Sequence, residues 1–308
     1  MDIIGLGTTA MDALIQVDSL PKEDGFALIQ NKTYIPGGSG TNVIVQAARL
    51  GAQTGFIAKV GNDAIGLDTV QSLKTENVDV SAIRVKEKGT SLNTQVIVDS
   101  RGAKFILLEM GDCFLNLEPE EIDFDLIKKA KVFYTDLIPG PPAISALKYA
   151  KKHGLRTAFN MQVDLKSMNN FSITKEMILD SLQYVDLFAP CREGLFQLCE
   201  TENLHECLTY IRPYFKHTLL ITLGSEGSIA FNKENKKFFQ PIEKVNVIDT
   251  TGAGDSYMGA MVFFYLLKGE PLKHSLRLAT ACAAITCSQL GARTGPKKDD
   301  LEDFLSSL

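Results

Sequence analysis

The run HTLLITLG, residues 217–224, constrains the fold of this chain more than any other stretch, because Leu, Leu and Ile stand at three successive positions. A strand that is apolar on both faces needs cover on both faces, which is typical of a parallel sheet between two layers of helices. Other short strand-like runs alternate with helix-like segments. The predicted strands are 55–60, 131–135, 156–160 and 185–189, and the predicted helices are 43–50, 65–75, 142–153, 254–268 and 272–289, with a short one after residue 299. We therefore predict an α/β fold with a mostly parallel central sheet and helices on both faces.

Two stretches interrupt this alternation. Residues 11–36 contain β-favouring pieces separated by Pro21 and Gly25, and the later stretch reads SLNTQVIVD and AKFILLE around a turn at Ser100-Arg101-Gly102. Neither stretch fits a strand–helix–strand unit. We expect residues 11–36 and 90–113 to form a small antiparallel β lid. The body would then comprise residues 1–10, 37–89 and 114–308.

Composition narrows the class of protein. The chain has 308 residues, of which 45% are hydrophobic and 22% charged, as in an ordinary globular enzyme. Its 37 acidic and 32 basic residues give a formal charge of −5, which argues against a nucleic-acid partner. No signal-peptide pattern and no apolar run of about 20 residues occurs, so we expect a cytoplasmic protein without a membrane partner.

The stretch Gly5-Leu6-Gly7-Thr8-Thr9-Ala10 has the spacing of a dinucleotide-binding loop. Such a loop must open a helix and be followed, about 20 residues later, by an acidic residue at the end of a second strand. Here MDALIQVD follows, which favours another strand and a turn. We therefore disfavour a dehydrogenase, and expect the glycines to let the first strand end close to another group, with Asp12 just beyond.

The stretch VIDTTGAGDSYMGAMVFFYLL, residues 247–267, is the strongest chemical signal. Gly252, Ala253 and Gly254 precede a long apolar helix, so their backbone N–H groups lie at a helix N-terminus, which favours anions. Asp255, in the first turn, is equipped to accept a proton from a hydroxyl that attacks phosphorus. The plainer alternative is an acidic residue that only complements the helix dipole.

A second glycine cluster opens another helix in YIPGGSGTNVIVQAARLG, residues 34–51. No Lys follows at the position that a P-loop requires. Asn42, a polar residue at the start of an apolar helix, indicates either a ligand contact or a helix cap.

The segments DTTGAGDSYMGA and GGSGTNVIVQAARLG together resemble the two signature regions of the ribokinase-like (PfkB) carbohydrate kinases, and the likeness extends over essentially the whole chain. The resemblance implies a ribokinase-like fold, ATP and Mg²⁺ as cofactors, and Asp255 as the base that activates a sugar hydroxyl. It assigns the anion hole for the transferred phosphoryl group to Gly252, Ala253 and Gly254. It implies substrate contacts at Asp12, Gly38 and Asn42 and nucleotide contacts at Thr222, Gly224 and Gly227. Asn160 and Gln162, after a predicted strand, could add hydrogen bonds to a polyol.

One segment departs from the family pattern. Relatives commonly carry an N-x-x-E motif that helps to position Mg²⁺, where this chain reads Cys191-Arg192-Glu193-Gly194. A thiol is a poor Mg²⁺ partner, so Glu193 would have to act from the neighbouring position, or ATP and other groups would hold the metal. The resemblance also implies a monovalent cation such as K⁺ near Asp249 and the backbone of residues 292–294.

We accordingly expect ATP-dependent phosphorylation of a hydroxyl of a small sugar or sugar derivative. The alternatives are a nucleoside kinase of the same family and a non-catalytic sugar- or nucleotide-binding protein. Arg101, at the lid turn, could meet an anionic substrate, although an exposed Arg in a turn often has no such role. Relatives often pair through their lids, which suggests a homodimer through this segment.

Overall fold

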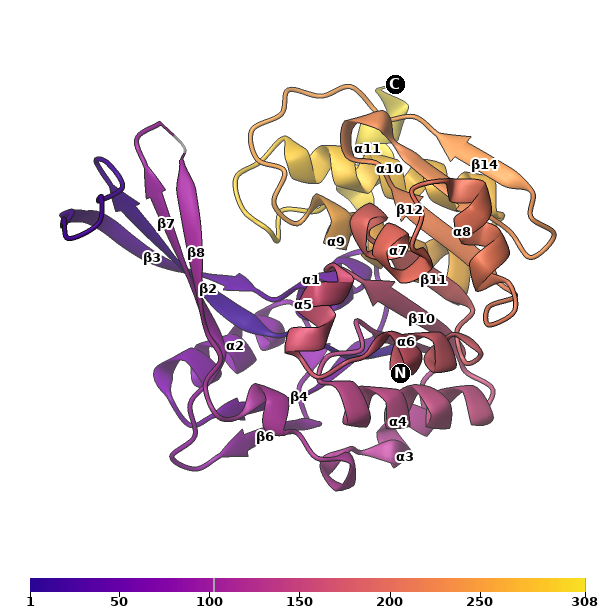
Figure 1. Ribbon diagram of the computed structural model, residues 1–308, viewed down its shortest axis with the longest axis horizontal. Coiled ribbons are helices and arrows are strands. Elements are labelled where there is room, and N and C mark those ends of the chain that lie inside the picture. The colour runs from indigo at the N-terminus through magenta and orange to yellow at the C-terminus, as the bar shows by residue number, and fades with distance from the viewer. Residues whose placement is uncertain (102, 308) are drawn as a thin grey trace.

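The computed structural model describes residues 1–101 and 103–307, which form two sheets (Figure 1). The ten strands of the main sheet are β1 (Ile3–Leu6), β4 (Thr54–Gly61), β5 (Val78–Asp79), β6 (Ile83–Lys86), β9 (Val132–Thr135), β10 (Arg156–Met161), β11 (Leu187–Pro190), β12 (Thr218–Thr222), β13 (Ser228–Phe231) and β14 (Lys237–Gln240). Their order is β14-β13-β12-β11-β10-β9-β1-β4-β5, and β6 also pairs with β4. Only the β12–β13 and β13–β14 pairs are antiparallel. The predicted mostly parallel sheet is therefore confirmed.

Helices cover both faces of this sheet, as predicted. The helices are α1 (Ser39–Arg49), α2 (Ala64–Thr75), α3 (Phe124–Lys128), α4 (Gly140–Lys152), α5 (Leu165–Asn170), α6 (Lys175–Leu182), α7 (Arg192–Cys199), α8 (Leu204–Ile211), α9 (Ala253–Met261), α10 (Leu272–Cys287) and α11 (Lys298–Ser306). Side chains of α3 to α8 build one core, and side chains of α1, α2 and α9 to α11 build the other. In β12, Leu219 and Ile221 pack into the first core and Leu220 into the second, so the strand is buried on both faces.

Two helix boundaries and one hairpin differ from the sequence expectation. Helix α1 begins at Ser39 rather than at residue 43, so the polar residues before the apolar stripe are already helical. The helix expected over 254–268 is regular only to Met261 and continues as a wider π-helical segment, Val262–Leu267. The antiparallel hairpin of β13 and β14 was not predicted from the sequence, although its entry turn carries two glycines at positive φ, Gly224 and Gly227.

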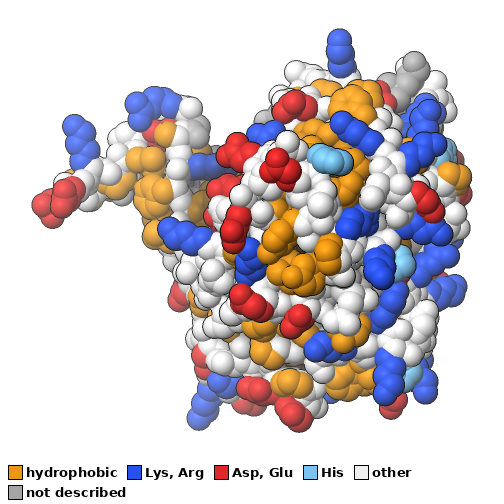
Figure 2. Space-filling view, turned by 45° about the vertical axis from the view of Figure 1, so that its right-hand side comes forward, with side chains coloured by type: hydrophobic (Ala, Val, Ile, Leu, Met, Phe, Trp, Pro, Cys, Tyr) orange, Lys and Arg blue, Asp and Glu red, His pale blue; other side chains and the backbone are white. Residues whose placement is uncertain are grey.

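The second sheet stands off the body, and we call it the arm (Figures 1 and 2). It consists of β2 (Ala10–Val17), β3 (Ile29–Gly37), β7 (Asn93–Asp99) and β8 (Lys104–Glu109) in the order β3-β2-β7-β8. The two outer pairs are antiparallel, as expected, whereas the middle β2–β7 pair is parallel, so the sheet is mixed rather than wholly antiparallel. Of the predicted turn, Gly102 lies outside the described residues. No helix in the described part of the chain is long and apolar enough to span a membrane.

Candidate active site

Glycines shape the start of helix α9, which lies at the carboxyl ends of the main strands. Gly252 has φ 78°, and a Cβ there would lie 2.1 Å from the carbonyl oxygen of Ala292. Only glycine fits this left-handed, crowded position. Around Gly254, by contrast, no atom lies within 4 Å of where a Cβ would be. The first turn of α9 therefore presents open backbone at a helix N-terminus.

Two adjoining pockets share the backbone of Gly254 and the side chains of Thr222 and Tyr257. The large pocket, of about 430 Å³, is lined by Gly224 and Gly227 and by apolar side chains, among them Ile242, Val245, Val247 and Ala283. The small pocket, of about 120 Å³, is lined by Asn160, Gln162 and Cys191. The two pockets together fit a flat apolar group with a polar tail, with the tail directed toward α9.

Asp255 lies in the first turn of α9 and is only 7% exposed. Its Oδ2 accepts a hydrogen bond of 2.8 Å from Nδ2 of Asn42, which lies in α1. Burial raises the pKa of Asp255 to about 7, against the opposing effect of the hydrogen bonds from Asn42 and Gln162. A carboxyl group with such a pKa can take up and release a proton near neutral pH.

Asp12 lies close to the glycines that precede α1. A Cβ on Gly37 would lie 2.3 Å from Oδ2 of Asp12, and one on Gly38, at φ 82°, would lie 2.6 Å from the backbone nitrogen of Ala10. Burial raises the pKa of Asp12, while a hydrogen bond with Thr94 lowers it. The pairing of β2 with β3 thus brings Asp12 to the start of α1, where Gly38 and Asn42 lie.

Gly5 and Gly7, in the opening stretch, allow neighbouring side chains to pack closely against the backbone. A Cβ on Gly5 would lie 2.6 Å from the side chain of Ile44, and one on Gly7 would lie 2.8 Å from Oδ1 of Asp136. Thr8 follows, and its N–H donates to Asp136 Oδ2 over 2.7 Å. Strand β2, not a helix, comes next, so no dinucleotide loop exists here.

Sequence reasoning missed Asp136 and Arg293. Asp136 is 1% exposed, and burial raises its pKa to about 6. A carboxylate at the end of a buried parallel strand is a signal that could have found it. Arg293, in the loop between α10 and α11, donates to Asn42 Oδ1 over 2.8 Å, across 251 positions of sequence. No local pattern could have found that contact.

A family model described as pfkB family carbohydrate kinase matches residues 2–299. The chain belongs to the PfkB carbohydrate kinases. "Probable fructokinase-6, chloroplastic" of Arabidopsis thaliana is 30% identical, over 94% of this chain and 80% of its own length. The 5-dehydro-2-deoxygluconokinase of Geobacillus thermodenitrificans is 27% identical over 100% of this chain and 94% of its own. The protein is accordingly an ATP-dependent sugar kinase.

The fold agrees with this membership. The structure of Arabidopsis thaliana ribokinase complexed with ribose and ATP matches 99% of this chain and 98% of its own, with a TM-score of 0.82 at 22% identity. The predicted ribokinase-like fold is therefore confirmed.

The segment that departs from the PfkB pattern forms the start of α7. Cys191 caps the helix by accepting from the N–H of Gly194 over 3.3 Å. Glu193 is exposed, accepts from Gln197 over 3.2 Å and lines neither pocket. A Cβ on Gly194 would already lie 3.0 Å from the Val163 carbonyl, so this helix start has little room for a longer side chain there.

Asp249 lies against Gly291, in the loop that precedes α11. Its Oδ1 accepts from the N–H and hydroxyl of Thr251, and its Oδ2 accepts from the N–H of Gly291 over 3.0 Å. Within the described residues, no group of three or more His, Cys, Asp or Glu side chains is arranged to hold a metal ion. Asp249 thus joins two loops by hydrogen bonds.

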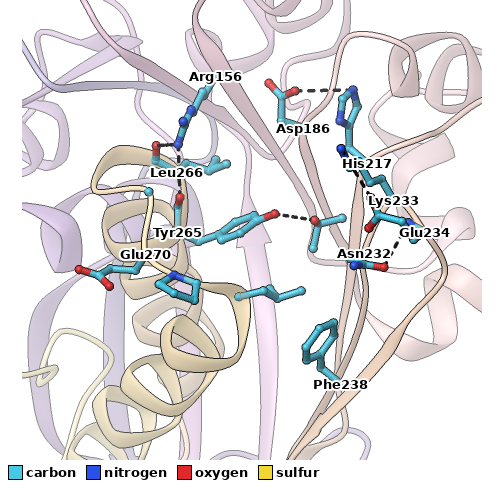
Figure 3. Close-up of a pocket in the computed structure, with 14 residues that line it drawn as sticks. Arg156, Asp186, His217, Asn232, Lys233, Glu234, Phe238, Tyr265, Leu266 and Glu270 are labelled. Carbon is cyan, nitrogen blue, oxygen red and sulfur yellow. Dashed lines mark hydrogen bonds and ion pairs between the residues drawn. The ribbon is translucent and has the colours of Figure 1, made fainter.

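A further pocket of about 430 Å³ lies at the opposite, amino-terminal edge of the sheet (Figure 3). Its polar groups pair with one another: Arg156 donates to the Leu266 carbonyl over 2.7 Å, Tyr265 bonds Thr218 over 2.8 Å, and Asp186 lies 3.7 Å from His217. Parallel sheets bind ligands outside the carboxyl ends of their strands. This pocket is therefore a junction between elements rather than a part of the site.

Proposed function

We propose that this kinase transfers the terminal phosphoryl group of ATP to a hydroxyl of a small neutral sugar, with Asp255 as general base. One observation carries the proposal. Asp255 stands in the first turn of α9, between a nucleotide-sized pocket and the cluster of Asp12, Gly38 and Asn42, and its pKa lies at about 7.

The large pocket suits the nucleotide. Its apolar walls suit a base, and Thr222, Gly224 and Gly227 line its side nearest the strands. The backbone of residues 252–254 would then receive the transferred phosphoryl group, since open N–H groups at a helix N-terminus stabilise developing negative charge. The relative solved with ribose and ATP supports this choice of ligands.

Mg²⁺ fits this site as an ion that arrives with the nucleotide. The described residues hold no ready cluster of acidic ligands, and Mg²⁺ typically keeps several waters and binds through substrate phosphates. Because Glu193 lines neither pocket, the phosphates of ATP and bound waters, rather than this side chain, would hold the metal. When bound, Mg²⁺ neutralises charge on the phosphates. A monovalent cation would lie beside Asp249 and the backbone of residues 292–294.

The sugar would lie between the main sheet and the arm. Asp12, Asn42 and Asn160 present carboxylate and amide groups, which suit the hydroxyls of a polyol. Arg293 donates to four protein acceptors, and Arg101 pairs with Asp99 at the tip of the arm. With these cations engaged, the surroundings favour a neutral sugar over a sugar phosphate. The relatives named for fructose and ribose support a neutral sugar acceptor, whereas the relative named for a deoxygluconate, a sugar acid, supports only a sugar derivative.

The reaction follows from these positions. Asp255 takes the proton of the attacking hydroxyl, and the start of α9 stabilises the transferred group. The arm would act as the lid that excludes water, which would otherwise accept the phosphoryl group.

We also propose that two copies pair through their arms. Strand β8 exposes Phe105, Ile106, Leu107 and Leu108 in succession, and hydrophobic side chains are visible on the arm in Figure 2. The registers Leu14↔Val96 and Val96↔Ile106 place Ile106 on the same face as Asp12, two residues along β2. A second copy covering this face would shield both the apolar side chains and the sugar.

The decisive experiment measures ADP release from ATP and Mg²⁺ with a panel of ketoses, aldoses, amino sugars, sugar phosphates, sugar acids and nucleosides. We expect turnover on one neutral sugar and a loss of at least about 10³-fold in Asp255→Asn. Preference for a nucleoside or an anionic sugar would refute the proposed substrate class. Full activity in Asp255→Asn would refute the proposed base.

A further inference from the structure

Arg293 connects the C-terminal part of the chain to the start of α1. Its Nε donates to Asn42 Oδ1 over 2.8 Å, and its Nη2 donates to the Gly37 carbonyl over 2.8 Å and to Thr41 Oγ1 over 2.9 Å. Its Nη1 donates to Ser72 Oγ over 3.2 Å. The guanidinium group is thus fixed by four acceptors on α1, α2 and the last residue of β3.

The contact with Asn42 determines which way that amide points. An arginine can only donate, and an ionised carboxylate can only accept. Asn42 lies between one of each, so its oxygen must face Arg293 and its NH₂ group must face Asp255. The 2.8 Å bond from Nδ2 to Asp255 is therefore a consequence of the 2.8 Å bond from Arg293.

This orientation affects the charge on Asp255. A hydrogen bond donated to the charged form of a carboxyl group favours that form. The charged and titratable groups that face Asp255 are Asp136 and Tyr134, from the end of β9, and Arg293. Gln162 and Asn42 add neutral donors. Arg293 is the only cation in this set. It lowers the pKa of Asp255, whereas burial and the charge of Asp136 raise it.

We propose that Arg293 is a positioning residue for the reaction: it orients Asn42 so that the amide donates to Asp255, and thereby keeps the base ionised near neutral pH. The proposal rests on the proposed role of Asp255. It assigns to Arg293 no contact with the sugar or the nucleotide.

Arg49 provides a matched control. Its Nη1 donates to the carbonyl oxygens of Arg293 and Gly295, over 2.6 and 2.8 Å, and its guanidinium pairs with Glu76. Arg49→Met thus removes a cation that supports the same loop without removing a contact to Asn42. Arg293→Met removes charge and donors together, whereas Arg293→Lys keeps the charge and loses the fork that reaches Asn42 and Gly37 at once.

The test has a readout that needs no turnover. In protein labelled with ¹³C at aspartate side chains, the titration midpoint of Asp255 is followed by NMR, with the signal assigned by its absence in Asp255→Asn. We expect a midpoint near pH 7 in the parent, about one unit higher in Arg293→Met and about half a unit higher in Arg293→Lys. Arg49→Met should titrate as the parent does. The acidic limb of kcat/KM should move by the same amount, about ten-fold per unit, while KM for ATP stays unchanged.

Equal Asp255 midpoints in the parent, Arg293→Lys and Arg293→Met would overturn the inference, and so would an equal shift in Arg49→Met. If Arg293→Met does not fold, the Asp255 midpoint in Arg293→Lys decides the question, because that variant retains the buried charge. Failure of the proposed function has a different signature. The parent would then phosphorylate no sugar, while the NMR midpoints would still decide whether Arg293 controls the ionisation of Asp255.

Discussion

Gly254→Ala should separate stability from catalysis. The added methyl group would meet no atom within 4 Å, and Gly254 has no positive φ. Alanine in a helix is more stable than glycine by roughly 0.5–1 kcal/mol, so we expect the unfolding free energy to rise by up to that amount. The same methyl group points into the space where a phosphoryl group would contact the helix N-terminus. Loss of one such donor typically costs about 10²–10³-fold, so we expect kcat/KM to fall about 10²-fold.

Urea denaturation and steady-state kinetics with the accepted sugar measure the two effects. Gly252→Ala is the contrasting variant, because its methyl group would lie 2.1 Å from the Ala292 carbonyl at φ 78°. We expect that variant to lose about 2–4 kcal/mol from left-handed strain and overpacking. Wild-type kcat/KM in a stabilised Gly254→Ala protein would refute the reasoning, since it would mean that no reacting group approaches this backbone.

One further outcome follows from the burial of Asp255 and another from the exposure of Ile106. The folded-state pKa of Asp255, about 7, lies above its unfolded value of 3.8, so its ionisation costs stability increasingly as pH rises from about 4 to 7. Asp255→Asn should therefore be more stable than the parent by about 2–4 kcal/mol near pH 8 and by little near pH 4.5, as measured by urea denaturation; a difference independent of pH would contradict this. In sedimentation velocity, Ile106→Lys should convert a dimer into monomers, whereas Leu67→Lys, an exposed change on α2, should not. A parent that sediments as a monomer would contradict pairing through the arms.

The architecture was readable from the sequence because it depends on local patterns. Buried strands such as β12 are recognisable in the sequence by apolar residues on both faces. The glycine clusters before α1 and α9 indicate where these helices begin. Asp255 and Asn42 could be singled out because each is a polar residue in the first turns of an otherwise apolar helix. The β13–β14 hairpin was missed because short strands at a sheet edge carry little periodicity.

The contacts among these segments could not be predicted from the sequence in the same way. Asn42 and Asp255 are 213 positions apart, and Arg293 joins Asn42 from 251 positions away. The pKa of Asp255 depends on the depth of burial and on neighbours from α1, β9, β10 and the last loop, which no spacing encodes. Likewise, Cys191 caps α7, and the position of this cap determines that Glu193 faces solvent.

The sequence by itself determined the layered α/β body and the two glycine-led helix starts, because periodicity and backbone freedom act over a few neighbouring residues. Only the tertiary structure decided which carboxylate is buried beside an amide and which cation bonds to that amide. Burial, charge and the direction of an amide are properties of groups that meet in space, and here they meet from opposite ends of the chain.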